Sequence, residues 1–238
     1  MNIIDVLIIL FLALGAVSGF KKGVIKTSVS FVGLVITIIL AFLLKNPVSV
    51  FLYENLPFFT FGGNIKGIEM LNILVYELIS FFIVFAILSI LLRAIISISG
   101  ILEKILKATF ILSIPSKILG LVVGLLEAYI YVFIALFVFS QPYFHIELFN
   151  DSKGTSFILN NTPVISDIAS NSLDTYKKLY DLINKHDGTN TLEVNAEILD
   201  MFLENKVITV NSASKLIEKD KLHVKNADEI LNKYREER

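Results

Sequence analysis

Four long apolar stretches dominate the first 140 residues, and a much more polar stretch follows them. A helix needs about 20 apolar residues to cross a hydrocarbon core of about 30 Å. Helices of soluble cores seldom run this long without a polar face. The sequence therefore predicts an all-α membrane protein, with a four-helix transmembrane unit in residues 1–140 and a small helical soluble tail in residues 141–238. The four predicted spans cover residues 3–19, 24–44, 70–92 and 118–140.

The two halves of the chain differ in charge. Residues 1–140 hold 9 Lys/Arg and 6 Asp/Glu, whereas residues 141–238 hold 12 Lys/Arg and 16 Asp/Glu. An acidic tail repels phosphate backbones, so we expect no nucleic-acid partner. The chain has no cysteine, which excludes disulfides, thiolate metal sites and lipid attachment at cysteine.

Basic residues set the predicted orientation. The loop between the second and third spans offers only Lys45 and Lys66, whereas the first and third loops hold seven basic residues. This difference favours a cytoplasmic position for the first and third loops. Both termini are then extracytoplasmic. No Lys or Arg precedes the first span, which is the reverse of a secretory signal, so we expect no cleavage. The topology-setting residues are Lys21, Lys22, Lys26, Arg93, Lys104, Lys107 and Lys117.

Glycines recur at four-residue spacing in the first and fourth spans. Small residues at this spacing let two membrane helices approach closely. The sequence leaves open whether they pack helices within the chain or between copies. It also leaves open whether the glycines around residue 20 only bracket a turn. The predicted packing residues are Gly15, Gly19, Gly23, Gly120 and Gly124.

Two connecting segments have distinct patterns. Residues 94–114 combine apolar residues at helical spacing with Glu103, Lys104 and Lys107, which predicts an amphipathic helix in the headgroup plane. The second loop carries Phe58, Phe59 and Phe61. We expect this aromatic patch to enter the membrane interface rather than to bind a ligand.

The tail pattern predicts short helices. They are expected from Thr162 to Gly188, at residues 195–204, at 212–219 and at 226–235. The predicted tail core is small, and small cores are marginal alone. The tail is therefore expected to rest on the membrane half or on another copy.

No catalytic, cofactor or metal pattern is present. His145, His186 and His223 lack the spacing of a helical zinc site, so we expect them on the surface. Glu77 and Glu127 lie inside predicted spans, where an insertion scale assigns about 2.5 to 3.5 kcal/mol to a central charge. They are expected to face other helices or water, either as hydrogen-bonded carboxyls or in an ion or proton path. Asp5 or the lipid headgroups are the expected neighbours of Glu77.

Several motifs resemble the colicin V production protein family (CvpA-like). They are Asn2-Ile3-Ile4-Asp5, Gly19-Phe20-Lys21-Lys22-Gly23-Val24-Ile25, and Ile118-Leu119-Gly120-Leu121-Val122-Val123-Gly124-Leu125-Leu126. The resemblance covers residues 1–140 and implies a bacterial inner-membrane protein with about four spans. Some relatives carry an extracytoplasmic protease domain, but this tail has no protease motif. Glu127 stands where the family often has a basic residue.

These patterns favour a non-enzymatic membrane scaffold or accessory factor for the cell envelope or for secretion. The expected partners are the lipid bilayer, a second copy or other membrane proteins, and a protein that binds the tail. The alternative is a small oligomeric channel or transporter that uses Glu77 and Glu127. The resemblance implies a role connected with toxin production.

Overall fold

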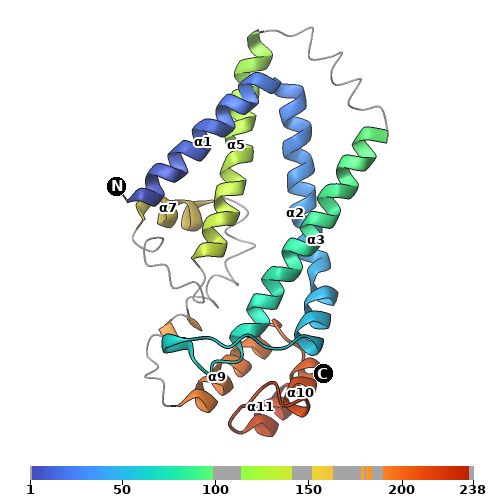
Figure 1. Ribbon diagram of the computed structural model, residues 1–238, viewed down its shortest axis with the longest axis vertical. Helices are drawn as coiled ribbons and strands as arrows, with labels where there is room; N and C mark the ends of the chain where they lie inside the picture. The colour runs from blue at the N-terminus through green and yellow to red at the C-terminus, as the bar shows by residue number, and fades with distance from the viewer. Residues whose placement is uncertain are drawn as a thin grey trace. The chain divides into compact units, whose positions relative to one another are not determined.

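The computed structural model describes residues 2–98, 114–140, 152–162, 178–179, 181–183 and 190–235. These residues form helices and turns and contain no strand, which confirms the all-α prediction. The long helices are α1 (Ile3–Lys22), α2 (Val24–Asn55), α3 (Leu71–Ile98) and α5 (Ile114–Phe139) (Figure 1). The shorter ones are η1 (Gly63–Ile65), α7 (Lys153–Asn161), α9 (Thr191–Glu204), α10 (Val210–Glu218) and α11 (Ala227–Arg235).

The four long helices are apolar and long enough to cross a membrane, which confirms the predicted transmembrane unit. All four are longer than expected, and α2 exceeds its predicted span the most. At about 1.5 Å per residue, the 32 residues of α2 extend about 48 Å, well beyond a hydrocarbon core of about 30 Å. Of the predicted interfacial helix at 94–114, residues 94–98 belong to α3 and Ile114 begins α5. Residues 99–113 lie outside the described residues.

The chain divides into two compact units. Unit 1 comprises residues 1–44, 81–140 and 145–162, and unit 2 comprises residues 45–80, 141–144 and 163–238. Helices α2 and α3 contribute residues to both. The division therefore differs from the expected one at residue 140, because residues 45–80 pack with the tail.

Unit 1 is organised around the packing of α1 against α5, and α7 lies against both helices (Figure 1). Large apolar side chains of these helices are exposed, among them Leu10 and Phe11 on α1 and Leu126 on α5. In a membrane protein such side chains face lipid. The polar and small residues described below therefore specify how the helices fit together.

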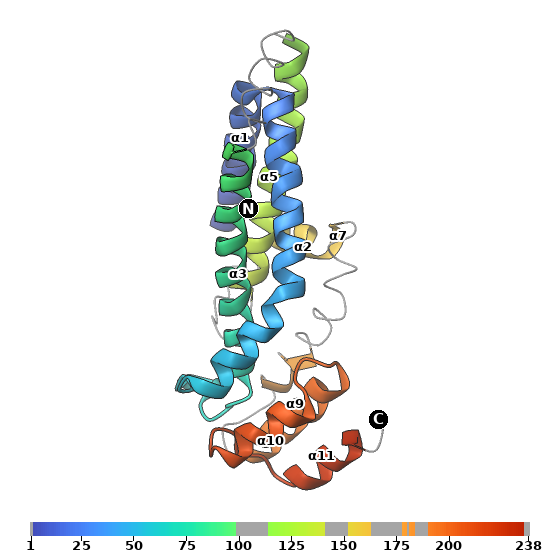
Figure 2. The same cartoon turned by 90° about the vertical axis from the view of Figure 1, so that its right-hand side faces the viewer.

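The core of unit 2 combines the tail with the ends of two long helices. Tail residues such as Ile198 and Phe202, both 0% exposed, join one hydrophobic cluster with Tyr53 of α2 and Leu71 of α3. Figure 2 shows α9, α10 and α11 together in this unit. Burial of apolar surface stabilises the assembly. The tail was expected to rest on the membrane half or on another copy. In the structure it packs on residues 45–80 of its own chain.

Three of the four predicted tail helices correspond to α9, α10 and α11, with ends shifted by up to four residues. The first, from Thr162 to Gly188, lies mostly outside the described residues. In that range, Leu179 and Ile183 are fully buried in the core of unit 2.

A buried amide joins the tail to the segment before α3. Asn195 of α9 is 1% exposed. Its Nδ2 donates to the carbonyls of Gly67 at 3.2 Å and His223 at 3.1 Å, and its Oδ1 accepts from the Met70 N–H at 3.4 Å. Buried polar groups cost free energy unless they are paired. Asn195 therefore fixes the position of α9 against this segment.

Lysines of the tail cap the end of α2. The Nζ of Lys221 donates to the carbonyls of Tyr53, Glu54 and Leu56 at 3.1, 2.9 and 2.8 Å. Lys219 Nζ also donates to the Glu54 carbonyl, at 2.9 Å. The last carbonyls of a helix lack partners within it and carry a partial negative charge. The tail therefore satisfies the end of α2.

The aromatic patch of the second loop is largely part of unit 2. Phe58 and Phe61 pack against its core, whereas Phe59 is exposed. The ring centroids of Phe58 and Phe59 lie 6.3 and 5.5 Å from that of Tyr76. The side chain of Asn72 pairs with both the N–H and the carbonyl of Phe59. Packing inside the protein thus accounts for two of the three rings that we expected at the membrane interface.

Candidate functional site

The predicted packing glycines lie where α1 and α5 approach most closely. A Cβ on Gly19 would lie 2.0 Å from the carbonyl oxygen of Gly120, and one on Gly124 would lie 2.5 Å from the carbonyl oxygen of Gly15. Real Cβ atoms do not approach backbone so closely. The two backbones are therefore in direct contact, and this contact is possible only without side chains.

Gly23 ends α1 and begins the turn into α2. Its φ of 76° lies in the left-handed region that favours glycine. A Cβ on Gly120 would also meet Gly23, at 2.8 Å from its carbonyl carbon. The Val24 N–H donates to Ser116 Oγ of α5 at 3.2 Å. The sequence left open whether the glycines around residue 20 pack helices or form a turn. Gly23 does both, because it begins the turn and contacts Gly120.

Glu127 lies near the middle of α5 and binds α2. Ser30 Oγ donates to Glu127 Oε1 at 2.6 Å. One helical turn further along α5 is Tyr131, and both Glu127 and Arg93 of α3 lie close enough to its hydroxyl to act on it electrostatically. A carboxylate at membrane depth costs about 2.5 to 3.5 kcal/mol on an insertion scale, so groups that stabilise it matter. Polar groups from α2, α3 and α5 thus gather at one level of unit 1.

Arg93 was predicted in the third loop, among the topology-setting residues. The structure has it inside α3, five residues before Ile98. Lys21, Lys22, Lys26 and Lys117 likewise lie within α1, α2 and α5, each close to a helix end. The count near the first and third loops therefore stays at seven basic residues against two near the second. The larger number of basic residues therefore still lies near the loops that are expected to be cytoplasmic. Lys104 and Lys107 lie outside the described residues.

Glu77 of α3 forms an ion pair with Lys45 of α2. Ser49 Oγ also donates to its Oε1, at 3.1 Å. Both charged side chains are largely buried, at 13% and 16% exposure. The expected neighbours were Asp5 or the lipid headgroups, but sequence spacing cannot show that α2 continues past residue 44. This pair joins α2 to α3 within unit 2, which favours a structural role for Glu77.

Asp5 joins the start of α1 to the start of α7, a link that the sequence analysis did not identify. Its Oδ1 accepts from Ser152 Oγ at 2.6 Å and from the Gly154 N–H at 2.9 Å. Its Oδ2 accepts from the Asn2 N–H at 2.8 Å. A carboxylate is favoured at a helix N-terminus, where backbone N–H groups lack partners. In the sequence, the sign of this link was an acidic residue at the very start of an apolar span.

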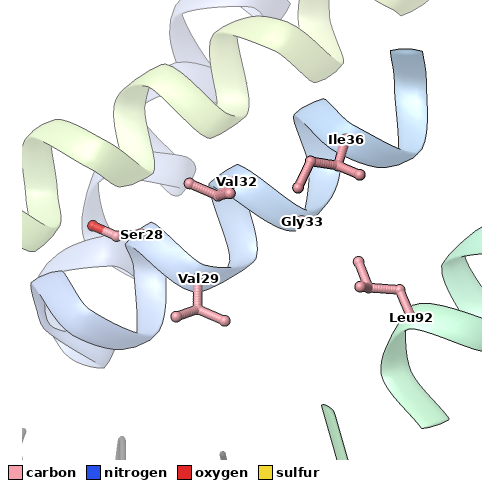
Figure 3. A pocket seen from close by; sticks show the side chains of 6 residues that line it. All are labelled: Ser28, Val29, Val32, Gly33, Ile36 and Leu92. Atoms are coloured by element: carbon pink, nitrogen blue, oxygen red, sulfur yellow. The ribbon is translucent and has the colours of Figure 1, made fainter. Parts of the chain in front are cut away.

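A shallow hollow lies between α2 and α3 of unit 1 (Figure 3). Its volume is 330 Å³, and its accessible lining is apolar. Figure 3 shows Leu92 of α3 facing Gly33 and Ile36 of α2. Of the residues that line it, Ser28 has a polar side chain. The remaining lining residues are Ser28, Val29 and Val32.

No group of three or more potential metal ligands occurs among the described residues. Of the three histidines, His145 and His186 lie outside them. His223 is about half exposed, as expected, but two carboxylates hold it. Its Nδ1 lies 2.8 Å from Glu69 Oε1 and its Nε2 lies 3.0 Å from Asp220 Oδ1. The hydrogen bond and charge of Glu69 raise the pKa of His223 above its usual 6.5.

This pair predicts a pH-dependent stability of unit 2. Because the folded-state pKa of His223 is raised, the stabilisation is complete below about pH 6.5 and is lost as the pH rises through the folded-state pKa. We expect a modest fall in the Tm of unit 2 across that window, since the imidazole is half exposed. The measurement is Tm against pH for the wild type and for His223→Gln, which should lack this component. Identical pH profiles for the two proteins would contradict the prediction.

Comparison with known proteins connects these features to a family. The sequence model described as "Colicin V production protein" matches residues 4–163. The "Uncharacterized transmembrane protein YshB" of Bacillus subtilis (strain 168) is 28% identical over 176 residues, which cover 68% of this chain and 93% of the relative. No solved structure matches the chain. The family match includes Asp5 and Ser152 and ends just after α7, so it spans the link between α1 and α7.

Proposed function

Because the chain belongs to the colicin V production protein family, we propose that it is a non-enzymatic membrane scaffold or accessory factor for the cell envelope or for secretion. In this proposal the protein lies in the bacterial cytoplasmic membrane, and both of its termini are extracytoplasmic. The membrane unit anchors the protein, and the tail binds a protein partner outside the cytoplasm.

The observation that supports this proposal most is the shared core of unit 2. The tail helices pack on residues 45–80, which include the last residues of α2 and the first residues of α3. A tail held in this way presents a defined surface instead of a flexible chain. The exposed face of α9 offers carboxylates, including Glu197 and Glu204. We therefore assign partner binding to the surface of unit 2.

The test compares a deletion with a surface variant in the source bacterium. Deletion of residues 150–238 should abolish partner cross-linking and reproduce the envelope or secretion defect of a full knockout. Because this deletion also uncovers the apolar core of residues 45–80, the second variant is Glu197→Lys with Glu204→Lys. It should weaken partner capture without lowering the Tm. If the deletion leaves every partner and phenotype unchanged, the scaffold proposal fails.

The orientation gives a separate prediction that two exposed positions can test. Asn160 of α7 and Lys22 at the end of α1 are exposed, whereas Ser116 and Ser152 are buried. Since the chain lacks cysteine, Asn160→Cys and Lys22→Cys each create a single thiol. An impermeant maleimide added to intact cells should label position 160, and position 22 only after lysis. The opposite pattern would invert the topology and direct the partner search to the cytosol.

A second candidate function is a small oligomeric channel or transporter. The specific observation that favours it is Glu127, a partly exposed carboxylate near the middle of α5. Such groups often mark ion or proton pathways. Purified protein in liposomes should then conduct an ion or solute, and Glu127→Gln should reduce the flux. Silent liposomes would count against this function.

A further inference from the structure

Unit 1 has a polar face formed by Ser30 of α2, Arg93 of α3, and Glu127 and Tyr131 of α5. Ser30 and Arg93 are exposed, Tyr131 is 46% exposed and Glu127 is partly exposed. Ser30 Oγ donates to Glu127 Oε1 at 2.6 Å. Leu92, the neighbour of Arg93 in α3, faces Gly33 of α2, three residues from Ser30. Among the described residues, neither Arg93 nor Glu127 has an ion-pair partner. We call these four residues the polar face.

Charged groups on a lipid-facing surface need a cover. Ionisable residues in membrane helices almost always face a protein interior or water and pair with one another. The other surfaces of these helices expose large apolar side chains, such as Ile90 of α3 and Leu126 of α5, which lipid solvates well. The polar face is therefore the part of unit 1 that gains most from contact with another protein surface.

The glycines of α1 and α5 do not provide that contact. Their small-residue surfaces meet each other inside the chain, with backbones too close to admit a Cβ. Association between copies therefore requires a different surface.

We propose that the polar face is a homodimer interface. A two-fold axis brings the same surface of two copies together, so each residue pair occurs twice. Glu127 then pairs with Arg93 of the partner subunit, and Arg93 pairs with Glu127 of the partner subunit. Ser30 and Tyr131 supply hydroxyls beside these pairs.

Charge complementarity selects a second copy as the occupant. The face carries one cation and one anion, so it is complementary to itself under two-fold symmetry. An anionic lipid headgroup would match Arg93 but would repel Glu127. Opposed charges across an interface also suppress wrong partners and fix the register.

The experiment measures copy number in lipid nanodiscs or sparse vesicles by single-molecule subunit counting. Glu127→Arg and Arg93→Glu each place like charges across the interface, and each should weaken dimerisation by at least about tenfold. The double variant restores opposite charges in swapped positions and should recover the dimer. Lys153→Glu on α7, which is exposed and outside the polar face, is the matched charge-reversal control and should dimerise like the wild type.

Three results would overturn the inference: a monomeric wild type, single variants that dimerise normally, or a swap that fails to recover the dimer. Tm values of all variants separate loss of dimer from loss of fold. A double variant with wild-type Tm that remains monomeric counts against the interface. Copy number does not depend on tail partners, so this test and the scaffold test can fail independently.

Discussion

Gly19→Ala should destabilise the membrane unit by about 1–3 kcal/mol or more, because one added methyl group forces two helices apart. The new Cβ would lie 2.0 Å from the Gly120 carbonyl oxygen and 2.8 Å from the Gly124 Cα. Both are backbone atoms, so no side-chain rotation relieves the overlap. Alanine favours a helix over glycine by about 1 kcal/mol. A net loss of stability in Gly19→Ala would therefore show that the backbone clash outweighs the gain in helix propensity.

Three glycine variants make the test specific. Gly120→Ala should behave like Gly19→Ala, since its Cβ would lie 2.4 Å from the Gly19 carbonyl oxygen. Gly33→Ala meets only the flexible end of Leu92, at 2.8 Å, and should cost less. Gly62 has nothing within 4 Å of its built Cβ, so Gly62→Ala should be neutral. Thermal unfolding of the purified protein measures the series, and equal Tm values for Gly19→Ala and Gly62→Ala would refute close backbone packing.

The second large effect is expected in unit 2, where Leu199→Ala should lower the free energy of unfolding by about 2–5 kcal/mol. Leu199 is 0% exposed in the core that α9 shares with residues 45–80. Removing its side chain loses apolar burial and leaves a cavity. We also expect faster proteolysis of the tail, because the loss is a large fraction of the stability of a small domain.

The matched control is Leu192→Ala in the same helix. Leu192 is 50% exposed, so its truncation should change stability by less than about 0.5 kcal/mol. Chemical unfolding monitored by tyrosine fluorescence and limited proteolysis provide two readouts. Similar losses for the two variants would mean that α9 does not pack on residues 45–80 through the face that contains Leu199.

Much of the architecture followed from local pattern. Length and hydropathy predicted four spans, and helical spacing predicted α9, α10 and α11. The C-terminal end of α2 was harder to predict than its start, since Lys45 and Pro47 interrupt the apolar run although the helix continues to Asn55. That extension is stabilised by the Lys45–Glu77 pair and by the lysines that cap its end. These partners lie far away in sequence, so spacing could not identify them.

The partners of individual polar residues likewise could not be predicted from sequence spacing. Their positions in the spans made Glu77 and Glu127 conspicuous, but only the fold shows that Lys45 neutralises the first and Ser30 binds the second. Asp5 was visible in the sequence as part of a motif. Its bonds to Ser152 and Gly154 connect residues about 150 positions apart, which no local pattern encodes.

By itself, the sequence determined the membrane class, the helical content and the division between apolar and polar halves, because hydropathy and helical periodicity are local properties. The glycine spacing likewise showed that two helices can approach closely. The tertiary structure decided that α1 packs on α5, that the tail packs on residues 45–80, and that Ser30 of α2 binds Glu127 of α5. Each of these depends on contacts between distant segments, whose pairing is set by packing and charge in three dimensions.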